Sequence, residues 1–239
     1  MAQVGIAIGL PFSEKLVHPR WAVALKTIDF PVNTQQSMIL VENQPYADAR
    51  NIIVKEAQKQ GCRYLWFIDD DVLVPRHAVQ ALGYILDQGI DDGTMVSTGI
   101  YCTKTYAPAP VIYRDDVPGA FWDWRVNDVF DVDAAGCGCM LINMKVFDSL
   151  EEPYFHTTEK YEEQGDGSLL TSVSEDIYFC RKVRAAGFKI KAHGAVICPH
   201  FNDKDGKFYE LPLDSIPYKR ERARQEAEKS QAEAQPAAV

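Results

Sequence analysis

Short apolar runs alternate with segments of helical periodicity along the first half of the chain. The apolar runs predict strands at residues 4–10, 37–42 and 63–68. Helices are predicted from His18, from about residue 46 to residue 60, and from Pro75 to near Gly89. Strands that alternate with helices form a parallel sheet with right-handed crossovers, so the pattern predicts an α/β fold.

The second half of the chain is less regular. Strands are predicted at 94–101, 129–133 and 189–197, and a helix begins at Ser174 and ends at Gly187. Residues 157–171 are polar and contain two glycines, which predicts a mobile loop. From residue 219 the chain is charged and rich in alanine, with no apolar stripe. We therefore expect one domain at 1–218 and a frayed-helical or disordered tail at 219–239.

Three consecutive carboxylates, Asp69, Asp70 and Asp71, follow the apolar run that ends at Ile68. Unpaired buried carboxylates are costly, so these acids must lie where the strand leaves the sheet. That is the carboxyl edge, where open α/β sheets bind ligands. Adjacent carboxylates repel one another unless a cation or hydrogen bonds relieve them. The pattern predicts either a site for a hard divalent ion, which would also take phosphate oxygens, or a solvated acidic turn.

Two further acids begin the helix that is predicted at Ser174. Asp176 heads a stripe with Cys180 and Val183 at helical spacing, so its carboxylate faces the interior or a cleft. A carboxylate at a cleft edge can act as a general base. Glu175 has a structural explanation instead, because it fits a capping box with Ser172.

Isolated residues elsewhere add candidates for a ligand site. Arg50 belongs to the helix beside the carboxylate strand, where it can contact a pyrophosphate or orient Asp69. His200 follows the last strand and is either a surface residue or a further metal ligand. Gly136 lies in a small-residue segment that lets the backbone approach a ligand closely. Trp122, with its neighbour Trp124, either stacks on a sugar or covers the core.

Composition limits the classes of protein. The chain has 239 residues, 46% of them hydrophobic, and a formal net charge of −9, which disfavours general nucleic-acid binding. No apolar run is long enough to span a membrane, and the N-terminus has no signal-peptide pattern. Most cysteines lie in apolar runs, as in reducing compartments, so we expect a cytoplasmic protein. One zinc alternative stays open, formed by Cys137, Cys139, Cys198 and His200.

Taken together, these segments resemble a glycosyltransferase of the GT-A fold, close to the large inverting group called family two. The resemblance covers roughly residues 4–201. It rests on the first strand ending at Pro11, on Ala49-Arg50-Asn51, on the DXD-like run through Asp71, on the glycine segment 136–141, on Ser174-Glu175-Asp176 and on Pro199-His200. The amino-acid sequence around these motifs is most similar to that of compact enzymes of bacteria and their phages.

The resemblance implies a single Rossmann-like domain with a mostly parallel sheet and a hexosyltransferase-like activity. It implies a nucleotide-sugar donor, Mn²⁺ or Mg²⁺ as the cofactor, and Asp176 as the base that deprotonates an acceptor hydroxyl. The ion would be held by Asp71, with Asp69 and His200 as further ligands. The donor would be contacted by the remaining candidates, which are Pro11, Phe12, Glu42, Arg50, Asp69, Asp70, Trp122, Gly136 and Glu175.

The acceptor is left open by the sequence: a glycan, a lipid, a small molecule and a modified nucleobase all carry suitable hydroxyls. Two other classes of function also remain. A nucleotidyltransferase needs metal-bound acids at strand ends as well, but the segment after the first strand offers only Lys15 as a basic residue. A non-catalytic nucleotide- or sugar-binding module on the same fold would bind a donor without hydrolysing it.

Overall fold

The structure is a computed structural model that describes residues 5–12, 17–89, 91–115, 119–160, 171–216 and 221. Apart from Glu221, the tail predicted at 219–239 lies outside the described residues, as do residues 161–170 of the predicted loop and the start of the first predicted strand. Within the described ranges, no helix is long and apolar enough to cross a membrane.

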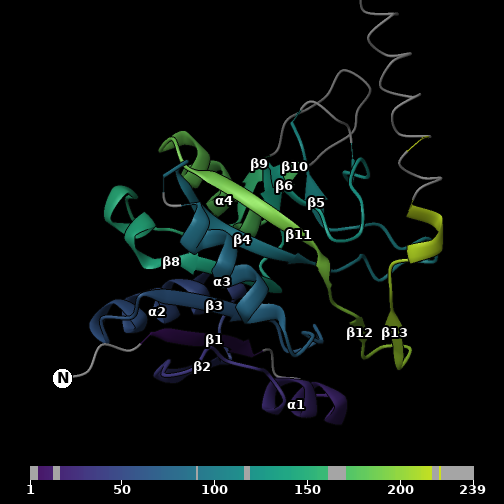
Figure 1. The fold of residues 1–239 in the computed structure, drawn as a ribbon, viewed down its shortest axis with the longest axis horizontal. Helices are drawn as coiled ribbons and strands as arrows, with labels where there is room; N and C mark the ends of the chain where they lie inside the picture. The colour runs from purple at the N-terminus through teal and green to yellow at the C-terminus, as the bar shows by residue number, and fades with distance from the viewer. Residues whose placement is uncertain are drawn as a thin grey trace, which may run out of the picture.

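Seven strands form the central sheet, in the order β2-β1-β3-β8-β4-β11-β6 (Figure 1). Their bounds are Gln36–Glu42, Ile6–Phe12, Tyr64–Ile68, Cys139–Asn143, Thr94–Ile100, Lys189–Ile197 and Val129–Val132, in that order. Strands β2, β1, β3, β4 and β11 run one way, while β8 and β6 are antiparallel to their neighbours. The sheet is therefore mostly parallel.

Helices and short ladders complete the chain. The α-helices are α1 (Pro19–Lys26), α2 (Tyr46–Lys59), α3 (Ala78–Gln88) and α4 (Glu175–Ala185), and the 3₁₀ helices are η1 (Met144–Ser149) and η2 (Leu213–Ser215). Three two-stranded sheets pair β5 (Ile112–Tyr113) with β7 (Ala134–Ala135), β9 (Thr158–Lys160) with β10 (Thr171–Val173), and β12 (His200–Asn202) with β13 (Lys207–Tyr209).

The two faces of the sheet have separate cores because side chains alternate along each strand. In β3, Leu65 and Phe67 pack on one face with residues of α2 such as Ile53. Trp66 and Ile68 pack on the opposite face, where Leu82 of α3 is buried. Every residue of β3 is buried, which explains the continuous apolar run in the sequence.

This topology gathers the candidate residues at one edge of the sheet. Phe12, Glu42 and Asp69 lie at or just beyond the carboxyl ends of β1, β2 and β3. Strand β8 runs in the opposite direction, so Gly136 precedes it at the same edge. His200 follows β11 and forms an isolated bridge with Val72, which brings the end of the chain's last long strand back to the acidic turn.

Candidate active site

The turn after β3 is fixed by contacts of its backbone. The Trp21 indole donates a hydrogen bond of 2.8 Å to the carbonyl oxygen of Asp69, which joins α1 to the turn. The backbone N–H of Phe201 donates to the carbonyl oxygen of Asp71 at 2.7 Å. Because the turn is hydrogen-bonded to two distant segments, the backbone positions of its three aspartates are fixed. Asp70 is the most buried of them, at 7% exposure.

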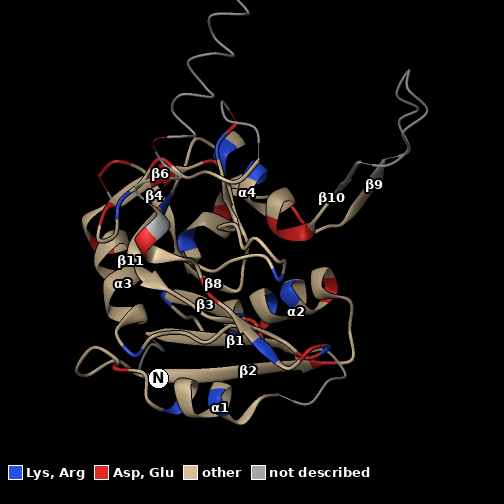
Figure 2. Cartoon of the chain, turned by 90° about the vertical axis from the view of Figure 1, so that its right-hand side faces the viewer, with Lys and Arg blue, Asp and Glu red and all other residues tan. Residues whose placement is uncertain are grey.

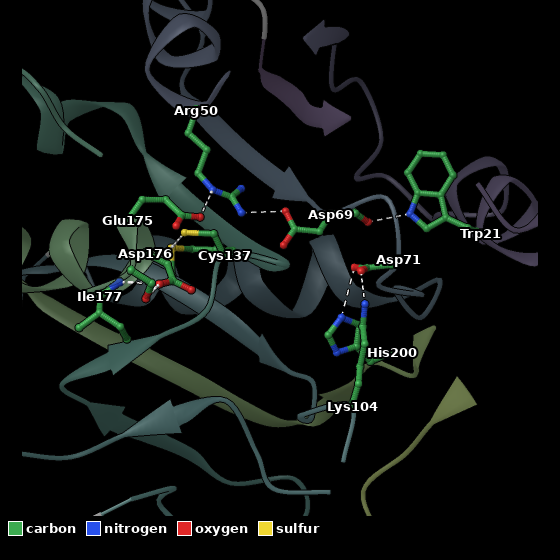
Figure 3. A network of polar contacts seen from close by, with 12 residues as sticks. Trp21, Arg50, Asp69, Asp71, Lys104, Cys137, Glu175, Asp176, Ile177 and His200 are labelled. Atoms are coloured by element: carbon green, nitrogen blue, oxygen red, sulfur yellow. Dashed lines mark hydrogen bonds and ion pairs between the residues drawn. The ribbon is translucent and has the colours of Figure 1, made fainter. Parts of the chain in front are cut away.

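The Asp69 carboxylate turns toward α2 and pairs with Arg50 (Figure 3). Arg50 is 2% exposed, and its Nη2 lies 2.8 Å from Asp69 Oδ1 while its Nε lies 3.4 Å from Glu175 Oε1. Its guanidinium also lies over the Phe67 ring, 5.2 Å from the ring centre. Its third nitrogen, Nη1, is buried and has no hydrogen-bond partner within the described residues. One arginine thus joins the end of β3 to the start of α4.

The buried position of this group changes its acid–base properties. Burial raises the pKa of Asp69 to about 6, against the opposing effect of Arg50, and the neighbouring Asp71 raises it further. Burial alone would lower the pKa of Arg50, but the Asp69 and Glu175 carboxylates hold it well above its ordinary value. Arg50 therefore stays charged inside the protein.

The Asp71 carboxylate points the other way, toward Lys104 and His200 (Figure 3). Lys104 Nζ forms an ion pair with Asp71 Oδ2, and His200 Nε2 lies 3.2 Å from Asp71 Oδ1. Burial would raise the pKa of Asp71, but His200 and Lys104 together hold it below its ordinary value. Asp71 therefore stays ionised more readily than Asp69.

The contact that His200 Nδ1 makes with the backbone shows which ring nitrogen carries a proton. Nδ1 lies 2.7 Å from the carbonyl oxygen of Cys102, and a carbonyl only accepts, so Nδ1 must carry hydrogen. Nε2 then faces Asp71 either as the N–H of an imidazolium or with its lone pair. A lone pair that faces a carboxylate at 3.2 Å requires a cation between them.

Asp176 lies in the first turn of α4, next to Glu175. Its Oδ1 accepts from the backbone N–H of Ile177 at 2.8 Å and from the hydroxyl of Ser174. Its Oδ2 has no hydrogen-bond partner in the part of the chain that the structure describes. The expected capping box is wrong: the helix begins one residue after Ser174, so Glu175 is its first residue and pairs with Arg50 instead.

Tyr101 is a central residue that sequence reasoning missed. It follows β4, is 7% exposed, and stacks edge-on against His200 with ring centres 5.1 Å apart. Burial raises the pKa of Tyr101 well above its ordinary value, and the charges of Asp176 and Asp69 raise it further, so its phenol lies near both acids. A Cβ at Gly136 would lie 1.8 Å from the Tyr101 hydroxyl oxygen. Gly136 is therefore required to make room for Tyr101.

The other expected donor contacts lie at the same edge or near it. Phe12 and Glu42 are register partners at the ends of β1 and β2, and the Phe12 ring packs edge-on against Trp21, with centres 5.4 Å apart. Trp124 is buried in the core and stacks on Phe130, which settles its role as a packing residue. Pro11 precedes Phe12 in β1, and Trp122 is partly buried against the same core as Trp124. Their contacts with a donor stay predictions.

No protein-family model matches this chain, and no curated protein matches it. Among solved structures, A197 from STIV has a TM-score of 0.58 and 18% identity, over 87% of this chain and 94% of that chain. TarS 1–349 from S. aureus, solved in complex with UDP-GlcNAc, has a TM-score of 0.48 and 11% identity, over 80% of this chain and 56% of that chain. Likeness at such identities shows the fold alone.

This chain has a GT-A fold. The mostly parallel sheet flanked by helices and the likeness to A197 confirm that prediction. The zinc alternative is wrong, because Cys137 and Cys139 belong to cores on opposite faces of the sheet. Within the described residues, no group of three or more His, Cys, Asp or Glu side chains is arranged around a possible ion. Asp71 and His200 approach one another as a pair of ligands would, with 3.2 Å between Oδ1 and Nε2.

Proposed function

We propose that the protein is a metal-dependent, inverting glycosyltransferase that moves a sugar from a nucleotide-diphosphate sugar to an acceptor hydroxyl. One observation carries the proposal: at the ligand-binding edge of a GT-A sheet, the Asp71–His200 pair and the Asp176 carboxylate flank a single buried network. Arg50 pairs with Asp69 at 2.8 Å and with Glu175, the neighbour of Asp176 in α4, at 3.4 Å, so one buried side chain links the acidic turn to the start of α4.

Asp71 and His200 fit an ion that is only partly held by protein. Two ligands at right angles, each about 2.1–2.2 Å from an ion, lie about 3 Å apart. The observed separation is 3.2 Å, and the hydrogen bond to Cys102 leaves the Nε2 lone pair available. Mn²⁺ or Mg²⁺ commonly binds one or two protein ligands and fills its remaining positions with water and phosphate oxygens. Such an ion would neutralise the charge of the departing nucleoside diphosphate.

Two cationic side chains add to this end of the site. Lys104 already neutralises Asp71, so its ammonium lies where the diphosphate of a donor would have to bind. The buried Nη1 of Arg50 lacks a partner within the described residues, and a phosphate oxygen would satisfy that donor. Asp69 then holds Arg50 in place, and its role as a direct metal ligand stays a prediction.

Asp176 would accept the proton of the acceptor hydroxyl. Its Oδ1 is held by Ser174 and by the Ile177 backbone, which leaves Oδ2 to take the proton as the hydroxyl oxygen attacks the anomeric carbon. The bond between the anomeric carbon and the diphosphate breaks in the same step, and the leaving nucleoside diphosphate keeps the electron pair.

The test uses Asp176→Asn and Asp71→Ala. A panel of nucleotide sugars with Mn²⁺ first identifies the donor by thermal stabilisation, and nucleoside diphosphate release measures turnover with water as the default acceptor. Asp176→Asn should bind the donor normally and lose about 10²–10⁴ in turnover, because only the base is removed. Asp71→Ala should lose the metal-dependent part of donor binding.

Asp131→Asn is the matched control, since this exposed residue of β6 lies outside the site. Full turnover in Asp176→Asn, with donor binding intact, would contradict the assigned base. Donor binding without any turnover in the wild type would favour a non-catalytic binding module instead.

A further inference from the structure

A cavity lies beside the Asp176 end of the site. It has a volume of about 270 Å³ and lies between α4 and the β5–β7 ladder. Tyr113, Ala134 and Ile177 form part of its wall, together with Arg114 and Arg181. The seven-stranded sheet and the Asp71 turn do not contribute to this wall. We call this cavity the α4 pocket.

The α4 pocket adjoins the proposed base. Ile177 lines the pocket, and its backbone N–H is bonded to Asp176 Oδ1 at 2.8 Å. Tyr113 lines it from the other side, and burial raises the pKa of Tyr113 with a further contribution from the Asp176 charge. A molecule in the pocket would therefore lie against the residues that border Asp176.

The positive and negative charges around the pocket do not balance, and a positive charge is left over. The two acids of its wall, Asp115 and Asp133, are both bound by Arg184, at 2.5 Å and 2.9 Å. Arg114 lies 4.0 Å from Asp133 as well. Arg181 is exposed and forms no ion pair within the described residues, so it leaves a positive charge that has no protein partner there.

We propose that the α4 pocket is the acceptor subsite and that it takes an acceptor with an oxyanion, a phosphate or a carboxylate, bound by Arg181. This inference rests on the proposed glycosyltransferase function. The planar guanidinium matches the geometry of both anions, and its bond to either is charge-assisted. Ile177 and Arg181 are four residues apart, so both lie on the face of α4 that lines the pocket, about 6 Å apart along the helix axis, and Asp176 directly precedes Ile177. That length suits a sugar ring with its reacting hydroxyl at one end and its charged group at the other.

The arrangement also explains the distribution of charge along α4. The first turn carries Glu175 and Asp176, and the basic residues follow toward the other end, with Lys182 and Arg184 in the last turn (Figure 2). In the proposal, Asp176 at the acidic end takes the proton and Arg181 binds the acceptor. Lys182 and Arg184 are held by protein partners. In a chain with a formal net charge of −9, such a local cation would favour the binding of an anionic molecule at this place.

The test compares matched neutral and charged probes by ligand-observed NMR titration of the full chain. The probes are glucose, glucuronate and glucose 6-phosphate, and the corresponding three forms of galactose. At least one charged member should bind about tenfold more tightly than its neutral parent, the effect of one charge-assisted contact. The two charged forms separate a carboxylate from a phosphate as the source of the oxyanion, and tighter binding of either supports the proposal.

Arg181→Gln should remove that preference, whereas Arg125→Gln, an exposed arginine outside the pocket, should keep it. The proposal is overturned if no charged probe binds more tightly than its parent, or if Arg181→Gln keeps the preference. If the proposed glycosyltransferase function is wrong, nucleotide-sugar binding and turnover at the Asp71 edge would be absent. If only the acceptor subsite is wrong, the preference for charged probes would be absent, so the two outcomes are distinguishable.

Discussion

Replacing Arg50 by methionine tests the network that joins the two acidic sides of the site. Methionine keeps much of the length and the apolar stem of arginine but removes the guanidinium. The Asp69 carboxylate, now 2.8 Å from Arg50 Nη2, would lose its cation while it stays buried beside the like charges of Asp70 and Asp71. Glu175 would lose its partner on the opposite side as well.

The structure sets the size of the expected effect. Arg50 is 2% exposed, so the pair belongs to the buried class, in which removal of one partner costs about 3–5 kcal/mol. For a domain of this size, each 1 kcal/mol lowers the melting temperature by about 2–4 °C, so the loss should be roughly 6–20 °C. Differential scanning calorimetry and urea unfolding at neutral pH measure it.

The matched control is Arg76→Met. Arg76 makes two bonds of 2.7 Å to Asp29, which look stronger than those of Arg50, but both partners are exposed. Exposed pairs contribute about 0–1 kcal/mol, so the melting temperature should fall by only about 4 °C or less. Equal losses in the two variants would refute the argument from burial.

A double variant separates the ion pair from simple packing. Asp69→Asn removes the charge that Arg50→Met leaves without a partner, so the double variant should recover part of the lost stability. We expect a coupling energy of about 0.5–3 kcal/mol, which is the range for residues in direct contact. Simple additivity of the two single losses would mean that the guanidinium acts through its packing against Phe67 and not through Asp69.

Three further predictions follow from single contacts. Gly136→Ala would force the Tyr101 ring to move, so we expect a loss of about 1–3 kcal/mol by urea unfolding together with lower donor turnover; unchanged turnover would show that Tyr101 does not matter. His200→Ala should weaken Mn²⁺ binding by about tenfold or more in a direct metal titration, and equal affinity would remove His200 from the metal site. The bond of Asp92 to Lys191 lowers the pKa of Asp92 to about 2, so the ionised carboxylate stabilises the folded state at every pH above its unfolded pKa of about 3.9. Asp92→Asn should therefore lower the melting temperature at neutral pH. The difference in melting temperature between wild type and variant should disappear as the pH falls through about 2.

The elements around the site could be predicted because local signals define them. The strand that ends in Asp69 is a continuous apolar run, and α2 has both a proline before it and Gly61, with a φ of 65°, after it. These signals need no information from distant residues. They were enough to place the acids at the carboxyl edge of a mostly parallel sheet.

Strand β8 was not predicted as a strand, and the reason is physical. Its residues, Cys139–Asn143, are buried on both faces between β3 and β4, so they show no alternation of apolar and polar positions. Its antiparallel direction depends on a long return of the chain from β4, which no short pattern encodes. The small residues before it were recognised, but their purpose, to make room for Tyr101, became visible only in three dimensions.

The directions of the three carboxylates could not be predicted either, because they depend on distant partners. Asp69 and Asp71 are two residues apart, yet one turns to Arg50 on α2 and the other to Lys104 and His200 beyond β4 and β11. Lys104 belongs to no motif and follows no periodic pattern, so only the folded chain identifies it. Sequence patterns place charged groups at an edge, but the competition among cations for each carboxylate is decided by packing.

That competition fits the proposed transferase function. If Asp69 were free to bind an ion, Arg50 would be left as an isolated charge at 2% exposure, which is more costly than keeping the pair. Asp71, whose cations are partly exposed, can exchange Lys104 for an ion and a diphosphate at much lower cost. Arg50 meanwhile holds Glu175, and with it the start of α4 that carries Asp176. In the proposed mechanism, the buried Asp69–Arg50 half of the turn would position Asp176 as the base, and Asp71 would be left to receive the donor.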